Sequence, residues 1–271
     1  MCPRAYRQGI YVTEQTTDPN NSIREKVAEH SAELVRLVEL LDLAFARGAK
    51  TSKAYEDRVV FPLLVSCRDI VEEILFAVNE GFGRAALRGA RTMYECVVIA
   101  RYLNLHPDKT DSFLSMFHVQ WAKILQNIPV QYRSPELDVS LTERVPKYAQ
   151  GKMVGLKDLN WSGEHTLAMA KEAGQLADIH SLAFDYASAY IHPSAIFFLT
   201  MLSQSSPDGE VFQVGTRSQE PEAMQALRIA HDLILNAVEL RLKYSPSVAQ
   251  QERFETCKED FIRIWGYPPH I

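Results

Sequence analysis

The chain has 271 residues, of which 46% are hydrophobic and 23% are charged, a composition typical of a folded globular protein and not of a disordered one. Its net charge of −5 argues against a protein whose main role is to grip a nucleic-acid backbone, although a small basic site is compatible with it. The longest apolar runs fall far short of the roughly 20 residues of a membrane-spanning helix, so we expect no membrane partner.

The cysteines and the N-terminus indicate a reducing compartment. Cys2, Cys67, Cys96 and Cys257 are scattered, with no C-x-x-C pair, and the N-terminal residues contain no apolar signal core. Cys67 and Cys96 lie inside apolar helical patterns, which predicts reduced, buried thiols. We therefore expect a cytoplasmic protein.

Helical patterns dominate the first half of the chain. After a polar arm (residues 1–21), periodicity predicts a helix from 22 to near 48 and a second from 51 to 79. Pro62 lies inside the second helix and predicts either a kink or a later helix start. The clearest helix of the sequence runs from 83 to 105 and is bounded by glycines before it and by His-Pro after it.

The second half begins with a helix after Asp108 that ends before Pro129. Residues 129–163 are irregular, and residues 210–214 are either a short strand or extended chain. Further helical segments are expected at 141–149, 164–173, 176–191, 195–202 and 221–244, and within the tail. The sequence thus predicts an all-α, single-domain multi-helix bundle over residues 22–245, with a tail at 246–271 that contains a short helix.

The central helix carries an unusual row of polar side chains. At 100° per residue, one narrow sector contains Arg84, Arg88, Arg91, Glu95 and Tyr102. The opposite side is small and apolar, suited to close helix packing. Because Arg91 and Glu95 are four residues apart, they are also able simply to pair with each other.

A second polar face lies at residues 180–194. Ser181, Asp185, Ser188 and His192 share one side of the predicted helix, which Pro193 ends directly after the histidine. A serine, an aspartate and a histidine on one face suggest a catalytic triad. However, a nucleophilic serine normally lies on a strained turn beside oxyanion donors, and the sequence has no such turn signal here.

Three motifs, in this order and separation, resemble a bacterial helical family catalogued only as a domain of unknown function. They are Arg91-x-x-x-Glu95, Trp161-Ser162-Gly163 and Ser188-x-x-x-His192-Pro193-Ser194. The resemblance covers roughly residues 55–245. It implies an all-α fold and a shared polar centre made of the Arg, Glu, Ser and His of the first and third motifs, and it implies no established activity.

The chain is more loosely similar to HEPN-type helical proteins, some of which cut RNA with an arginine and a histidine four to six residues apart. Here no arginine occurs between Asp178 and Met201, so Arg88 or Arg91 would supply the positive charge from another helix. His192 would act as general acid or base on a ribose hydroxyl or leaving oxygen. This similarity implies RNA as the partner, a metal-independent ribonuclease, and a role in stress or phage defence.

Two alternatives remain open at this stage. The same four residues, the candidate catalytic set, also suit a buried network that fixes helix registry in a non-catalytic interaction or scaffold protein, for example a homodimer. A metal could bind His192, Glu95 and one of Asp69, Glu72 or Glu73, but the chain lacks the Glu-x-x-His pair of di-iron bundles, so we expect no metal and no cofactor. The side chains expected to border the centre and bind a ligand are Arg84, Arg88, Trp161, Asp185 and Tyr190.

Overall fold

A computed structural model describes residues 21–45, 57–114, 128–135, 161–162, 164–191, 202–204, 212–214, 219–244 and 247–271. Its α-helices are α1 (Asn21–Glu29), α2 (Ser31–Ala44), α3 (Asp57–Asn79), α4 (Gly83–Leu105), α8 (Thr166–Glu172), α9 (Ala187–Ile191), α11 (Glu220–Tyr244) and α12 (Val248–Trp265). Single turns of 3-10 helix occur at η1 (Pro107–Lys109), η2 (Val130–Tyr132) and η4 (Gln175–Ala177), and a π-helix at η5 (Ser181–Tyr186).

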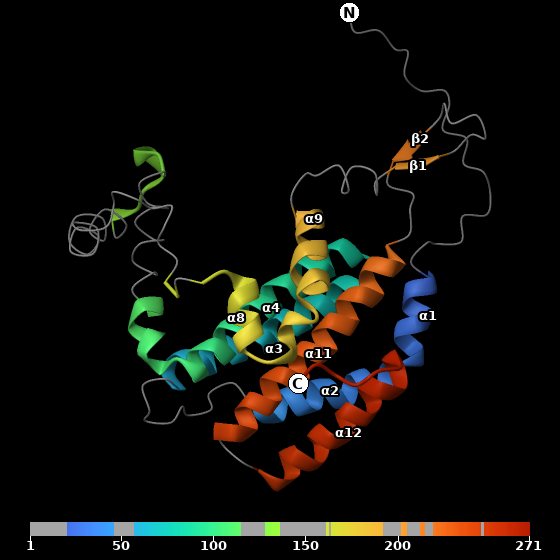
Figure 1. Ribbon diagram of the computed structural model, residues 1–271. Coiled ribbons are helices and arrows are strands. Elements are labelled where there is room, and N and C mark those ends of the chain that lie inside the picture. The colour runs from blue at the N-terminus through green and yellow to red at the C-terminus, as the bar shows by residue number, and fades with distance from the viewer. Residues whose placement is uncertain are drawn as a thin grey trace, which may run out of the picture.

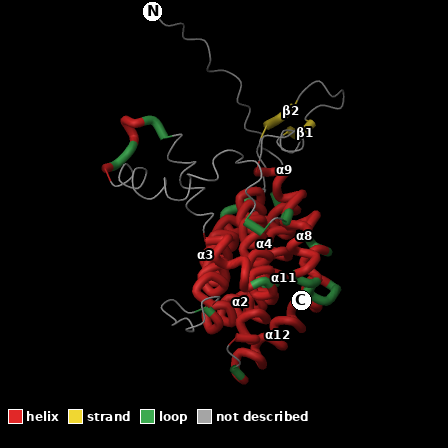
Figure 2. The backbone as a smooth tube through the Cα atoms, turned by 60° about the vertical axis from the view of Figure 1, so that its left-hand side comes forward, coloured by secondary structure: helices red, strands yellow, loops and turns green. Residues whose placement is uncertain are grey.

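The helices pack around α4, which is in contact with α3, α8, α9 and α11, while α2 and α12 pack against each other and against α11 (Figure 1). Leu87, Met93 and Val97 of α4 are fully buried. The all-α prediction and the central helix at 83–105 are therefore confirmed. Besides the helices, the structure contains one antiparallel ribbon of β1 (Leu202–Gln204) and β2 (Phe212–Val214). Figure 2 shows this ribbon at one end of the helical body.

The direction of α4 is set by the turn that precedes it. Gly81 has a positive φ of 78°, and its N–H donates to the Val78 carbonyl (2.9 Å) while the Phe82 N–H donates to the Ala77 carbonyl (2.7 Å). These two bonds form a Schellman cap, which ends α3 and reverses the chain. As a result α4 lies antiparallel to α3 along a shared seam.

The partner on another side, α11, runs parallel to α4. The first residue of α4, Gly83, lies against Gln219 at the start of α11, and Arg101 near the other end of α4 donates to the Asn236 carbonyl (3.2 Å). Arg84 and the fully buried Glu222 form an ion pair at this shared N-terminal end (4.0 Å). A carboxylate in the first turn of a helix is favoured by the helix dipole.

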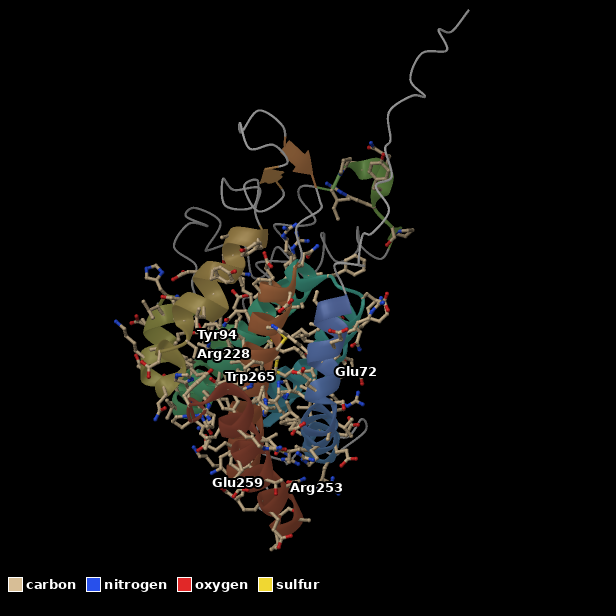
Figure 3. All side chains as sticks on the ribbon, turned by 90° about the vertical axis from the view of Figure 1, so that its right-hand side faces the viewer. Glu72, Tyr94, Arg228, Arg253, Glu259 and Trp265 are labelled. Atoms are coloured by element: carbon tan, nitrogen blue, oxygen red, sulfur yellow. The ribbon has the colours of Figure 1, made fainter. Side chains whose placement is uncertain are left out.

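The C-terminal residues pack onto the bundle. The helix expected to be short is α12, with 18 residues, and its Phe254 and Phe261 are buried. Its charged side chains Arg253 and Glu259 lie at the end of the bundle away from the strands (Figure 3). Beyond it, the His270 N–H donates to Asp232 (2.9 Å) and the His270 ring lies 2.6 Å from the same carboxylate.

Two predicted helices are interrupted. The helix expected from 22 to near 48 is split at His30 into α1 and α2, and the regular helix expected over 176–191 consists of η4, η5 and α9. Helical periodicity in the sequence does not separate 3-10, π and α turns, because all of them place apolar residues three to five apart. The segment predicted at 141–149, most of the helix predicted after Asp108 and residues 195–201 of the helix predicted at 195–202 lie outside the described residues. Leu202, the last residue of that predicted helix, begins the strand β1 instead. Within the described part of the chain, no helix is long and apolar enough to cross a membrane.

Candidate functional site

The polar row of α4 meets the segment 180–191 at a seam that we call the Arg91 cluster, made of Arg91, Glu95, Phe184 and Ser188. Arg91 Nε donates to Ser188 Oγ (2.8 Å), and its two terminal nitrogens donate to the two oxygens of Glu95 (3.2 and 3.4 Å). The guanidinium also lies over the Phe184 ring, 4.4 Å from its centroid. Arg91 is therefore fixed on both its edge and its face.

The cluster is half-buried and electrically balanced. The Arg91 side chain is 22% exposed and the Glu95 side chain 34%. Burial raises the pKa of the Glu95 carboxyl, and the charge of Arg91 offsets part of this rise. The remaining outward N–H groups of Arg91 are the ones available to a further acceptor.

Arg88, one turn before Arg91, joins the same seam. One of its terminal nitrogens donates to the Tyr190 carbonyl (3.2 Å), near the end of α9. Arg88 also lines a hollow of about 300 Å³ between α3 and α4, together with Glu73, Gly89 and Thr92. Arg88 thus connects the Arg91 cluster with an open space on the surface.

Behind the cluster lies a buried tyrosine–histidine pair. The Tyr94 hydroxyl donates to the Leu176 carbonyl (3.1 Å) and lies 3.0 Å from His180 Nδ1. The hydroxyl has one hydrogen, which it donates to Leu176, so toward His180 its oxygen acts as the acceptor. His180 Nδ1 is then the donor of this second bond and carries a proton. Burial raises the pKa of Tyr94, so the hydroxyl stays neutral. His180 stacks on Phe184 with ring centroids 5.0 Å apart, which couples this pair to the cluster.

The segment between His180 and Ser188 has unusual helical geometry. Residues Ser181–Tyr186 form the π-helix η5, and α9 continues directly from it. Such π turns are rare and are often found at functional sites. In this chain η5 presents Phe184 to Arg91, and the first turn of α9 places Ser188 beside the guanidinium.

Residues 57–210, more than half of the chain, match DUF5677, a family of unknown function. The chain belongs to this family. No curated protein and no solved structure gives a match. The DUF5677 region contains α3, α4, α8, η5 and α9, and therefore the whole Arg91 cluster.

Of the residues expected in the polar centre, the structure brings Arg91, Glu95 and Ser188 together. His192, which follows α9, lies outside the described residues, as do Gly163 and the Pro-Ser pair after His192. The Arg-x-x-x-Glu segment of α4 thus contacts the serine of Ser-x-x-x-His-Pro-Ser directly.

The residues expected to border the centre are distributed more widely. Arg84 contacts Glu222 at the start of α11, and Trp161 packs edge-on against Tyr102 (5.7 Å between centroids) near the far end of α4. Asp185 is turned toward His180 Nε2 (3.8 Å). The polar side chains of this sector therefore contact different elements along the 23-residue helix α4, and do not form one site.

The sequence analysis did not single out three contributors to this region, Phe184, Tyr94 and His180. The available signal was the spacing of His180, Phe184 and Ser188, each four residues from the next. It was hidden because an aromatic residue in a helix usually indicates core packing.

No group of three or more His, Cys, Asp or Glu side chains converges within the described ranges. Asp69 and Glu72, two of the three carboxylates that the sequence offered as alternative ligands, lie 3.6 and 3.0 Å from the guanidinium of Arg68. His192, the histidine of that alternative, lies outside the described residues.

Replacing Ser188 with alanine is expected to lower the free energy of unfolding by about 1 kcal/mol, because Arg91 Nε loses its acceptor. A matched control is Ser66→Ala: like Ser188, which donates to the Phe184 carbonyl, Ser66 donates to the carbonyl four residues earlier (3.0 Å to Pro62), but it lies on the exposed side of α3. Urea unfolding of both variants measures the difference. Equal stability of the two variants would contradict a contribution from the Arg91–Ser188 bond.

Proposed function

We propose that this protein is a HEPN-like helical protein that binds RNA and cleaves it without a metal, with the Arg91 cluster and His192 as its working centre. The observation that carries the proposal is that Glu95, Phe184 and Ser188 fix Arg91 in place. Ser188 precedes His192 by four residues in the sequence. An arginine held rigidly in a half-buried seam is pre-organised to bind a phosphate oxygen.

In the proposed reaction, His192 accepts the proton of a ribose 2′-hydroxyl, whose oxygen attacks the adjacent phosphorus. The bond from phosphorus to the 5′-oxygen breaks, and that oxygen takes up a proton from water as it leaves. Arg91, with Arg88 beside it, stabilises the negative charge on the phosphate oxygens. The products carry a 2′,3′-cyclic phosphate and a 5′-hydroxyl, and no metal enters.

The acidic net charge of −5 limits how such a protein binds RNA. Recognition through Arg88 and Arg91 alone engages about two phosphates, so the logarithm of affinity should fall with the logarithm of salt concentration with a slope of only about −1.4. A cytoplasmic location and a role in stress or phage defence belong to this proposal through the family resemblance.

The test is cleavage of an end-labelled single-stranded RNA by the full chain in the presence of EDTA. The wild-type protein should give products with a 2′,3′-cyclic phosphate, and His192→Gln should lower the rate by about 100-fold or more. His165→Gln is the matched control, since His165 is exposed at the start of α8. Absence of cleavage by the wild type, or equal rates for wild type and His192→Gln, would refute the catalytic part of the proposal.

A second candidate function, a non-catalytic interaction or scaffold protein, is favoured by the same ion pair. Glu95 neutralises Arg91, and Ser188 accepts from its Nε, as expected of a cluster that only fixes α4 against α9. On this account the variants change stability alone, and the wild type binds no RNA. Sedimentation of the purified chain would then show whether the partner is a second copy.

A further inference from the structure

Two cysteines from neighbouring helices are in contact in the α3–α4 seam. Cys67 of α3 is fully buried and Cys96 of α4 is partly buried; both are free thiols. The Cys67 thiol donates to the Leu63 carbonyl (3.5 Å), and the two thiols lie near enough for each to shift the pKa of the other. Cys257, also free and buried, lies on α12 and has no thiol partner among the described residues.

The register of the two antiparallel helices explains this contact. The two helices pack closely at Gly89, where an added Cβ would lie 2.8 Å from Ile74 Cγ1. Moving two turns, or seven residues, forward along α4 leads from Gly89 to Cys96. The same two turns backward along α3 lead from Ile74 to Cys67. The glycine that lets the helices approach thus also sets the two cysteines opposite each other.

The two thiols differ in their readiness to ionise. Cys96 is the more exposed of the two, since Cys67 is fully buried, so Cys96 is the thiol that a small oxidant reaches first. Interaction with the Cys67 thiol also lowers the pKa of Cys96, whereas interaction with Cys96 and burial raise the pKa of Cys67. Cys96 is therefore the nucleophile of the pair, and Cys67 is its neighbouring thiol.

We propose that Cys96 is an oxidation site for small peroxides, and that it closes a reversible disulfide with Cys67. The Cys96 thiolate attacks one peroxide oxygen, the O–O bond breaks, and a sulfenic acid and hydroxide form. The Cys67 sulfur then attacks the sulfenic sulfur, gives up its proton, and releases water as the S–S bond forms. Two thiols are oxidised and one peroxide is reduced. Cys96 directly follows Glu95 of the Arg91 cluster in the sequence, but its oxidation does not depend on RNA binding or cleavage.

The experiment uses the full wild-type chain, treated with hydrogen peroxide, alkylated under denaturing conditions and digested with trypsin without reduction. Cys67 and Cys96 fall in separate peptides, residues 59–68 and 92–101, and Cys257 falls in residues 254–258. Mass spectrometry should find the first two joined, with the loss of two hydrogens, at a level at least about tenfold above any disulfide that contains Cys257. A reducing agent should restore both free peptides.

Variants sharpen the assignment of roles. In Cys67→Ala, the sulfenic acid on Cys96 has no second thiol, so its trapping by dimedone should rise several-fold above the wild type. The control Cys257→Ala should form the Cys67–Cys96 bond as the wild type does. The proposal is overturned if peroxide leaves Cys67 and Cys96 separately alkylated in the wild-type map, or if it oxidises Cys257 as readily as Cys96.

Discussion

Replacing Gly83 with alanine is expected to lower the free energy of unfolding by about 3 kcal/mol. Gly83 is the first residue of α4, where that helix starts beside α11. A Cβ at this position would lie 2.2 Å from the Gln219 carbonyl oxygen and 2.6 Å from the Ala223 nitrogen. Both are backbone atoms of the neighbouring helix start, so relief requires one helix to move away from the other.

Gly89→Ala is the matched control in the same helix. Its added Cβ would meet a side-chain atom, Ile74 Cγ1, at 2.8 Å, and alanine in the middle of a helix gains up to about 1 kcal/mol over glycine. We therefore expect a smaller loss than for Gly83→Ala. Urea unfolding followed by circular dichroism measures both. If Gly83→Ala were as stable as the wild type, the close parallel packing of α4 and α11 would be wrong.

Acidification from pH 6.5 to about pH 4 is expected to remove about 3 kcal/mol of unfolding free energy through His231. His231 of α11 is only 1% exposed. Burial lowers its pKa to about 4, and the Cys257 backbone and Asp260 offset only part of this effect. Trp265 donates its indole N–H to His231 Nδ1 (3.3 Å), which holds the ring in its neutral form.

The direction follows from proton linkage. The pKa of His231 is lower in the folded state, so the unfolded chain binds the proton first and acid favours unfolding. Its contribution is complete above pH 6.5 and is lost as the pH falls toward the folded value. His270 acts in the opposite direction: its bond to Asp232 raises its pKa, so that contribution is complete below pH 6.5 and is lost as the pH rises through the folded value.

His231→Asn isolates the effect, because asparagine keeps an acceptor for Trp265 but does not titrate. Unfolding free energies of variant and wild type, measured at several pH values from 4 to 6.5, should show a flatter pH dependence for the variant. The groups common to both proteins, including Glu95 and His270, cancel in the comparison. Parallel curves would mean that His231 is not buried as a neutral imidazole.

The sequence analysis identified the parts of the fold that depend on long apolar periodicity. The ends of α4 were predicted correctly because glycines precede it and His-Pro follows it, and these are strong helix boundaries. The break at His30 and the π turn at 181–186 were missed, because each changes the helix locally while leaving its apolar spacing almost intact. The parallel pairing of α4 with α11 depends on contacts between residues more than 130 positions apart, which no local pattern contains.

The candidate site was predictable to a similar degree. The pair Arg91–Glu95 follows from i, i+4 spacing, and its contact with Ser188 was expected from the family motifs. The π-helix sets which residues of the second segment face α4, so Phe184 joined the cluster and Asp185 turned toward His180. The fate of Arg84 was likewise decided by a residue of another helix, the buried Glu222.

The central claim is that Arg91 contacts RNA, and the most direct measurement is the binding of a fluorescent single-stranded RNA to wild type, Arg91→Lys and Arg228→Lys by anisotropy. Arg228 is the matched control, since its guanidinium also lies 4.4 Å from the centre of an aromatic ring, that of Tyr267, and it belongs to α11 (Figure 3). Lysine keeps the charge but loses the fixed planar donors.

We predict that Arg91→Lys weakens RNA binding by about tenfold or more, while Arg228→Lys binds as the wild type does. Thermal unfolding of the same samples confirms that each variant is folded during the measurement. RNA binding that is absent from the wild type, or equally strong in folded Arg91→Lys, would contradict the account and leave the Arg91 cluster with a purely structural role.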